Sequence, residues 1–374
     1  MHVDTVLLKV ASRCNLDCSY CYVYHMGDES WRSLPKRMSD ATRAAVARQL
    51  GALERSQGRS FSIVLHGGEP LLLGKDGLDR LLADLRAAVS PFCGISVQTN
   101  GALLTDAILD VLAAHGTSLS VSLDGDAVVH DRFRVDLRGL PTHAAVAAGL
   151  ARLKAHPRSE VLFSGILAVV DPKSCPNAVY DYFKGLGTPS VDFLYRDGNH
   201  STLPYGKASP TSVEYGSWMC QILDRYVADP DPFRIRMLDD MIRLELGGAG
   251  VKEGVGLTDY GILVIDTDGA IKKNDTLKSS SPGDGFDAYW NVHSHSLTDV
   301  AASREFRDYH LAQRPSSPTC LPCPLLRTCG GGMVTHRYAE GQGYDNPTVF
   351  CSDQTKLIHR IRLHLARLRP RAAA

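Results

Sequence analysis

The sequence predicts an α/β fold, a partial (β/α)6 barrel of the TIM type with a smaller domain on its C-terminal side. Two observations lead to this prediction. Short runs rich in Val, Ile, Leu and Phe recur six times, as expected of parallel strands buried on both faces. Segments with helical periodicity separate the runs, and such alternation is typical of α/β barrels. The predicted strands span Thr5–Val10, Phe61–Leu65, Ile95–Thr99, Leu119–Leu123, Val161–Val170 and Val191–Tyr195.

The helical segments between the strands carry apolar residues on one face. The alternation weakens after about residue 225, where Asp229-Pro-Asp-Pro232 interrupts the chain. We therefore predict a core barrel over residues 1–230 and a second domain over 231–374, which ends in a basic helix over Ser352–Arg369. The predicted helical stripes consist of Val46, Leu50 and Leu53 and of Leu78, Leu81, Leu82, Leu85 and Val89.

Composition excludes several classes of partner. The 374 residues include 44% apolar and 22% charged residues, and the formal net charge is zero, so we expect no nucleic-acid partner. No apolar run is long enough to span a bilayer, and the first residues do not resemble a signal peptide. We therefore expect a cytoplasmic location and no membrane partner. Ten cysteines in such a chain favour metal binding or catalysis over disulfides.

The first cysteine motif follows the first predicted strand. Cys14, Cys18 and Cys21 have the spacing C-x3-C-x2-C, and three thiolates on one loop can hold three irons of a 4Fe–4S cube. The fourth iron then keeps an open position, as open metal sites do when they bind a substrate. A zinc knuckle is the alternative, but structural zinc takes four ligands and no nearby His supplies a fourth.

These residues resemble the radical S-adenosylmethionine (SAM) superfamily, whose loop reads C-x3-C-x-aromatic-C, with Tyr20 in the aromatic place. In that family the open iron chelates SAM. Gly67-Gly68-Glu69-Pro70 resembles the GGEP motif of the family. The resemblance implies that the glycines let the backbone approach the ligand and that Glu69 accepts a hydrogen bond from the SAM ammonium group.

Polar residues at the ends of the next two strands resemble the SAM-contacting positions of the family. Gln98 and Asn100 end the third strand, and Ser122 and Asp124 end the fourth. Each pair is followed by Gly, so ordinary Asn-Gly and Asp-Gly turns are the competing interpretation.

A second cysteine cluster lies near the C-terminus, at Cys320, Cys323, Cys329 and Cys351. Four thiolates can ligate a 4Fe–4S cluster or a zinc ion. The spacing resembles the SPASM domain of radical SAM peptide maturases, which holds two auxiliary clusters. Asn274 and Met333 stand where that family has cysteines of the first auxiliary cluster. The resemblance therefore implies one auxiliary 4Fe–4S cluster, on the four cysteines present.

Asp275 follows Asn274 at the position of a proposed catalytic base in sulfatase maturases of the same superfamily. The alternative interpretation is that Asp275 only forms a turn together with Asn274.

The stretch Cys329–Tyr338, with Gly343-Tyr-Asp-Asn-Pro347, resembles a branch of peptide maturases that joins a side-chain Cβ to an aromatic ring to form a cyclophane.

The predicted function is therefore radical SAM modification of a ribosomally made precursor peptide, most simply a carbon–carbon cross-link. A low-potential electron donor such as flavodoxin or ferredoxin is the expected partner besides the peptide. One alternative is oxidation of a Ser or Cys side chain to formylglycine, as in sulfatase maturases. An alternative of another class is a non-catalytic zinc-ribbon adaptor, which the intact cysteine triad and the GGEP motif argue against.

Overall fold

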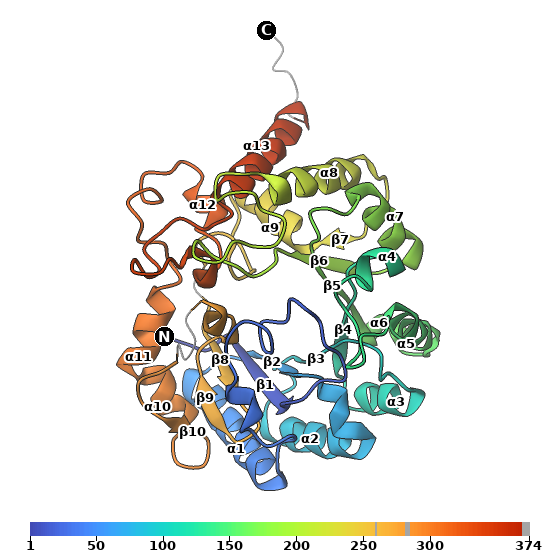
Figure 1. Ribbon diagram of the computed structural model, residues 1–374. Coiled ribbons are helices and arrows are strands. Elements are labelled where there is room, and N and C mark those ends of the chain that lie inside the picture. The colour runs from blue at the N-terminus through green and yellow to red at the C-terminus, as the bar shows by residue number, and fades with distance from the viewer. Residues whose placement is uncertain (259, 281–284, 369–374) are drawn as a thin grey trace. The chain divides into compact units, whose positions relative to one another are not determined.

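The computed structural model describes residues 1–258, 260–280 and 285–368 (Figure 1). The chain packs as two compact units, which do not follow the predicted division at residue 230. That division stays a prediction. The first unit contains Met1–Leu167 and Tyr260–Leu311, and the second contains Ala168–Asp259 and Ala312–Ala374.

The first unit is built on a sheet whose strands run in the order β10-β9-β8-β1-β2-β3-β4-β5. Strands β1 to β5 pair in parallel with their sequence neighbours, as predicted. Their bounds are β1 (Thr5–Ala11), β2 (Ser62–Gly67), β3 (Ile95–Thr99), β4 (Ser118–Ser122) and β5 (Phe163–Val169). Two strand ends differ from the prediction by two residues. The second strand runs on to Gly67, and the fifth begins at Phe163 because the exposed Val161 belongs to a short helix, α6 (Ser159–Leu162).

Helices connect these strands and cover the sheet (Figure 1). Both predicted apolar stripes are confirmed, since their leucines and valines are buried. Helix α1 begins after Ser39, whose side chain accepts a hydrogen bond from the backbone N–H of Thr42, and ends at the left-handed Gly58. The helices of this unit are α1 (Asp40–Gln57), α2 (Gly74–Ala88), α3 (Asp106–Ala114), α4 (Ala127–His130), α5 (His143–Ala155), α10 (Leu297–Ala302) and α11 (Arg304–Leu311), with 3-10 turns η1 (Ser30–Arg32), η2 (Pro70–Leu73) and η3 (Asp275–Ser279).

Three late strands extend the sheet beyond β1. Strand β8 (Ile262–Ile265) pairs in parallel with β1, and β9 (Ala270–Lys272) and β10 (Trp290–Asn291) continue in antiparallel fashion (Figure 1). The turn between β8 and β9 needs Gly269, whose φ of 86° lies in the left-handed region. This pairing brings residues that are remote in sequence next to the strand that leads into the first cysteine motif.

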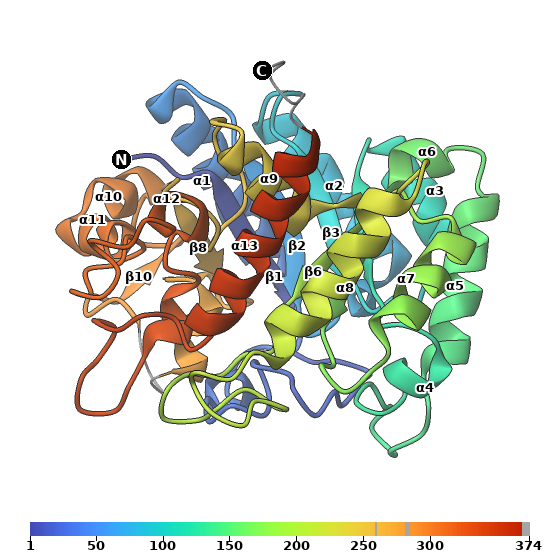
Figure 2. The ribbon, with the colours of Figure 1, turned by 90° about the horizontal axis from the view of Figure 1, so that it is seen from above.

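The second unit contains the pair β6 (Ser190–Leu194) and β7 (Arg234–Ile235), which run in parallel. Helices α8 and α13 lie side by side (Figure 2). The predicted C-terminal helix is confirmed as α13, while Arg369 lies outside the described residues. The helices of this unit are α7 (Pro176–Leu186), α8 (Glu214–Ala228), α9 (Arg236–Glu245), α12 (Leu326–Cys329) and α13 (Cys351–Leu368), with the 3-10 turn η4 (Val334–Arg337).

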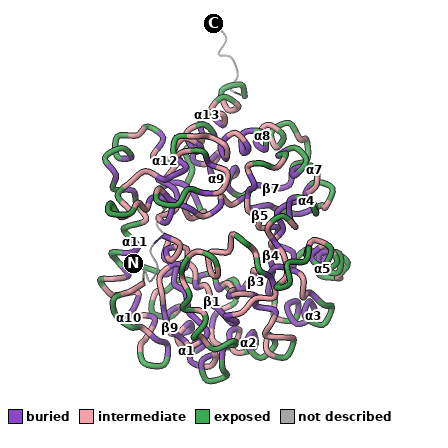
Figure 3. Tube along the Cα trace, viewed as in Figure 1, coloured by how far each residue is buried: buried purple, intermediate pink, exposed green. Residues whose placement is uncertain are grey.

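Burial follows the central strands (Figure 3). Val6, Leu8 and Val10 of β1 and Ile63 and Leu65 of β2 are fully buried, which accounts for the apolar runs in the sequence. Among the described helices, none combines the length and the apolar character needed to cross a membrane.

Candidate active site

The first cysteine motif lies on a loop that begins where β1 ends. Cys14, Cys18 and Cys21 are free, half-buried thiols. Backbone hydrogen bonds from Asp17 to Val135, at 2.8 Å, and from Ser19 to Phe133, at 3.0 Å, hold the loop against a neighbouring segment. The loop is thus fixed by backbone contacts that leave its thiols uncommitted.

The surroundings of Cys14 fit a metal-bound thiolate. Burial raises the pKa of the Cys14 thiol to about 12, and the nearby carboxylate of Glu69 and thiols of Cys18 and Cys21 add to this shift. Two groups are placed to donate to its sulfur: the backbone N–H of Leu16, 3.4 Å from Sγ, and the Asn100 side-chain amide, 3.7 Å from Sγ. Iron replaces the thiol proton on binding, and such donors then stabilise the anionic sulfur.

Among the described residues, no three His, Cys, Asp or Glu side chains form a group placed to hold one metal ion. A zinc site needs its four sulfurs around one atom, whereas a 4Fe–4S cube binds each thiolate to a different iron.

The two glycines of the GGEP motif are needed for packing against the cysteine loop. A Cβ on Gly67 would lie 2.1 Å from the Ala11 carbonyl oxygen, and one on Gly68 would lie 2.2 Å from the Arg13 carbonyl oxygen. The backbone N–H of Gly68 donates to Ala11, and that of Glu69 donates to Arg13, both at 2.9 Å. In the described contacts these glycines therefore bring β2 onto the cysteine loop, and backbone approach to a ligand stays a prediction.

Glu69 is the centre of a buried hydrogen-bond network, with 1% of its surface exposed. Its Oε1 accepts from the backbone N–H of Leu71, at 2.9 Å, and from Thr99 Oγ1, at 2.7 Å. Its Oε2 accepts from the backbone N–H of Asn100, at 2.8 Å. Burial raises the pKa of Glu69 to about 7 although these donors oppose the shift.

Asn100, Gln98 and Ser122 lie around the same strand ends. The Asn100 side-chain amide donates to Asn15 Oδ1, at 2.8 Å, so it joins β3 to the cysteine loop. Gln98 Nε2 donates to Ser122 Oγ across 2.9 Å and so links β3 to β4. The structure thus brings Asn100 to the loop and pairs the other two, and their contact with SAM stays a prediction.

Asp124 forms a buried ion pair that also holds the aromatic residue of the cysteine motif. The Tyr20 hydroxyl donates to Asp124 Oδ2, and Arg134 Nε donates to the same oxygen across 3.1 Å. The Arg134 guanidinium lies over the Tyr20 ring, 5.3 Å from its centroid. Asp124 therefore positions Tyr20 and Arg134, and a contact of Asp124 or Tyr20 with SAM stays a prediction.

Asp275 lies at the start of η3 with 2% of its surface exposed, next to the amino end of Lys9 from β1. Lys9 Nζ pairs with Asp275 Oδ2 and also lies 3.4 Å from Asp266 Oδ1. Burial opposes the charge of Lys9, yet Asp275 and Asp266 raise its pKa above the ordinary value. Asp275 Oδ1 lies 4.0 Å from Lys278 Nζ and has no hydrogen-bond partner among the described residues.

Asn274 and Met333 have structural contacts at the positions where the SPASM pattern has cysteines. Asn274 Oδ1 accepts a hydrogen bond from the backbone N–H of Thr276, at 3.2 Å, and so caps η3. The backbone N–H of Met333 lies 3.2 Å from the place where Gly254 would carry a Cβ. Neither residue offers a thiolate, and the loss of a first auxiliary ligand set stays a prediction.

The second cysteine set lies in the second unit, around α12 and the start of α13. Cys320 is buried, and Cys323, Cys329 and Cys351 are half-buried free thiols. Burial raises the pKa of two of these thiols, Cys320 and Cys329, and each of them has other cysteines of the set among the charged groups that add to the shift. The residues here therefore fit an iron–sulfur cluster.

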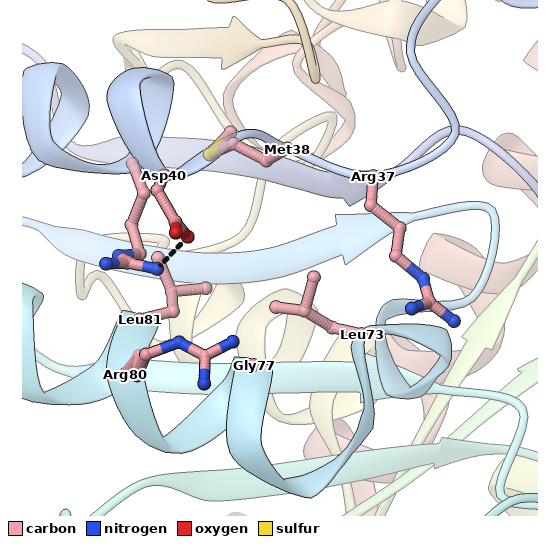
Figure 4. A pocket seen from close by; sticks show the side chains of 8 residues that line it. Arg37, Met38, Asp40, Leu73, Gly77, Arg80 and Leu81 are labelled. Carbon is pink, nitrogen blue, oxygen red and sulfur yellow. Dashed lines mark hydrogen bonds and ion pairs between the residues drawn. The ribbon is translucent and has the colours of Figure 1, made fainter.

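A separate pocket of about 140 Å³ lies between the starts of α1 and α2 in the first unit (Figure 4). Arg37 and Arg80 point toward it, and Arg43 is paired with Asp40 across 2.5 Å. No predicted site residue is among those that line it, so it does not belong to the candidate active site.

Comparison with known proteins identifies the class that this fold and site define. Residues 8–169 match the sequence profile of the Radical SAM superfamily. The chain is an enzyme, and the cofactors that this match indicates are a 4Fe–4S cluster and SAM. A serine-type anaerobic sulfatase-maturating enzyme from Bacteroides thetaiotaomicron is 25% identical over 364 residues, which cover 89% of this chain and 83% of that protein.

Two solved structures share the fold. Native anSMEcpe with bound AdoMet has a TM-score of 0.83 at 21% identity, and the match covers 97% of this chain and 99% of that one. Streptococcus suis SuiB bound to precursor peptide SuiA has a TM-score of 0.63 at 15% identity, and the match covers 92% and 74%. These likenesses confirm the predicted α/β architecture.

Sequence reasoning missed two residues of the site. Lys9 lies inside an apolar strand, where only its charge marks it as unusual. Arg134 has no recognisable spacing from the cysteine motif. Lys9 and Arg134 each pair with a predicted site residue, Asp275 and Asp124, so only the tertiary structure reveals them.

Proposed function

We propose that this radical SAM enzyme modifies a side-chain Cβ of a ribosomally made peptide. The observation that carries the proposal is Asp275, a buried carboxylate with one oxygen paired to Lys9, while the other lies 4.0 Å from Lys278 Nζ and has no hydrogen-bond partner among the described residues. Lys9 belongs to the strand that leads into Cys14, so the proton acceptor and the cysteine loop are anchored to one element. Radical chemistry on a peptide side chain needs such an acceptor once hydrogen has been removed.

Cys14, Cys18 and Cys21 would hold the SAM-binding cluster, and Cys320, Cys323, Cys329 and Cys351 would hold one auxiliary cluster. When bound, reduced cluster and SAM supply a 5′-deoxyadenosyl radical that removes a hydrogen atom from the substrate. Asn100 and the backbone N–H of Leu16 stabilise the Cys14 thiolate. Glu69 keeps β2, β3 and the cysteine loop in register through its three donors and accepts from the SAM ammonium group.

In the cross-linking version, the Cβ radical adds to a neighbouring aromatic ring of the peptide. The ring regains aromaticity by losing one proton, which Asp275 Oδ1 accepts, and one electron, which the auxiliary cluster on Cys320, Cys323, Cys329 and Cys351 would take up. Lys9 Nζ pairs with Asp275 Oδ2 and so holds this carboxylate in place. The product is lighter than the precursor by two hydrogen atoms. Asn274 and Met333 favour this version, since only one auxiliary ligand set remains.

A second candidate is oxidation of a Ser or Cys side chain to an aldehyde. The likeness to sulfatase-maturating enzymes over most of the chain favours it, and Asp275 would then accept the hydroxyl or thiol proton. The incomplete first auxiliary ligand set counts against it.

The test is incubation of the anaerobically reconstituted enzyme with SAM, dithionite and candidate peptides. The candidates are short reading frames beside the gene and a sulfatase-type peptide with Ser or Cys. A cross-link gives a product that lacks backbone fragments across the ring in tandem mass spectrometry. An aldehyde instead reacts with a hydrazide probe and fragments normally. A peptide product with neither property, or a redox-neutral one, contradicts the proposal.

A further inference from the structure

Arg337 is the largest fully buried side chain in the second unit, with 1% of its surface exposed. No carboxylate in the described part of the chain forms an ion pair with its guanidinium. A buried charge without a counter-charge is strongly unfavourable, so such a cation needs an anionic partner. The structure therefore raises the question of what balances this charge.

Backbone carbonyls surround the guanidinium and fix its position. Arg337 Nε donates to Gly331, at 2.9 Å, while its terminal nitrogens donate to Gly332, at 2.7 Å, to Gly330, at 3.3 Å, and to two carbonyls at residues 312 and 313. The three glycines have φ angles of 65°, 80° and 67°. Only glycine adopts this left-handed run readily, and the run turns three successive carbonyls onto Arg337.

The same glycine run begins directly after Cys329, so the guanidinium lies beside the second cysteine set. Burial lowers the pKa of Arg337 to about 10, and the thiols of Cys320 and Cys329 are the charged groups that oppose this shift. Carbonyl dipoles hold the cation but cannot neutralise it. The four cysteine thiolates can neutralise the charge of Arg337, because a 4Fe–4S cluster with four thiolates carries a net negative charge.

We propose that Arg337 is the buried counter-charge of the auxiliary cluster on Cys320, Cys323, Cys329 and Cys351, and that it raises the reduction potential of this cluster. The inference rests on the proposed auxiliary cluster. Reduction adds one electron and hence one negative charge, which a fixed cation stabilises more than it stabilises the oxidised form. Arg337 is thus a positioning residue that acts through the cluster and touches no substrate.

The experiment uses the full chain with Cys14, Cys18 and Cys21 all replaced by Ala, so that only the auxiliary site can hold iron. Iron and sulfide are counted after anaerobic reconstitution, and the midpoint potential is measured by a dithionite titration followed by electron paramagnetic resonance. The variants are Arg337→Gln, which removes the charge, and Arg337→Lys, which keeps it. Arg327→Gln is the matched control, because Arg327 is an exposed arginine on α12, between Cys323 and Cys329.

Arg337→Gln should lower the reduction equilibrium constant at least tenfold, which is about 59 mV for one electron. Arg337→Lys should change it by less than about threefold, and Arg327→Gln by less than about twofold, because water screens the exposed charge. If the Gln variant binds no iron while the Lys variant does, this result also supports the role of Arg337 as a counter-charge.

Three results would overturn the inference. Equal potentials in all variants would show that the charge has no effect on the cluster. Equal shifts of the midpoint potential in the Gln and Lys variants, or loss of iron from both, would show that Arg337 acts only by holding the backbone carbonyls in place. Absence of iron from the parent chain would instead refute the auxiliary cluster itself. It would also refute the part of the proposed function that relies on that cluster.

Discussion

Glu69 Oε2 accepts a hydrogen bond from the backbone N–H of Asn100 across 2.8 Å, so the GGEP motif is joined directly to the end of β3. With Thr99 and Leu71 on the other oxygen, the carboxylate receives three donors. A carboxylate accepts at both oxygens, whereas an amide accepts at only one.

Replacement Glu69→Gln should therefore destabilise the fold and abolish SAM binding. The amide nitrogen would face a backbone N–H, which leaves a buried donor unsatisfied at a cost of about 1–3 kcal/mol. Urea unfolding of the apo chain measures the first effect, and equilibrium dialysis of SAM with the cluster-loaded chain measures the second. Glu160→Gln, at an exposed position, is the control. Unchanged stability in Glu69→Gln would contradict the network.

The same carboxylate should give the apo chain a distinctive pH dependence. Burial raises the pKa of Glu69 to about 7 from an ordinary value of 4.5, so the folded chain binds this proton more tightly than the unfolded chain. The stability contributed by this group is thus fully present below about pH 4.5 and is lost as pH rises to about 7. Between pH 5 and pH 7.5, the wild type should lose roughly 2 kcal/mol relative to Glu69→Gln. A pH-independent difference between the two chains would refute this assignment.

Removing Asp124 should leave Arg134 as an unpaired buried charge. Asp124→Asn should destabilise the chain by about 3–5 kcal/mol, whereas Tyr20→Phe, which removes one hydrogen bond, should cost about 1 kcal/mol. Asp136→Asn is the control, because Asp136 pairs with the exposed Arg138. Urea unfolding of the apo variants measures all three. If Asp124→Asn unfolds like the wild type, Asp124 has no structural role and acts only on a ligand.

Asp275→Asn should separate SAM cleavage from product formation. We expect product to fall by at least about 100-fold while 5′-deoxyadenosine is still formed, because the variant lacks only the proton acceptor. Asp28→Asn is the control, since Asp28 pairs with Lys278 of the same 3-10 turn. Liquid chromatography of nucleoside and peptide from one reaction compares both yields. Equal loss of both would mean that Asp275 supports the cluster or SAM and is no base.

Much of this fold is predictable from sequence. Parallel strands such as β3 are continuous apolar runs, and the Leu stripe of α2 has an unambiguous helical period, so local physics alone determines them. The cysteine motifs are local for the same reason, since their ligands lie close together in the chain.

What sequence reasoning missed depends on contacts between distant segments. Strands β8 and β9 are short, and only the pairing of β8 with β1 and of β9 with β8 brings Asp275 to Lys9 across most of the chain. The GGEP glycines show the same limit. Their sequence predicts that the backbone approaches a ligand, which stays a prediction, and the structure adds close packing against the Ala11 and Arg13 carbonyls, which no local pattern reveals.

The most direct test of the central claim counts iron and follows SAM cleavage in one oxygen-free preparation. The wild-type chain should be brown, bind about eight irons per chain and convert SAM to methionine and 5′-deoxyadenosine under dithionite. The chain with Cys14, Cys18 and Cys21 replaced by Ala should keep about four irons and form no 5′-deoxyadenosine. A colourless wild-type chain, or an iron-loaded one that leaves SAM intact, would contradict the account.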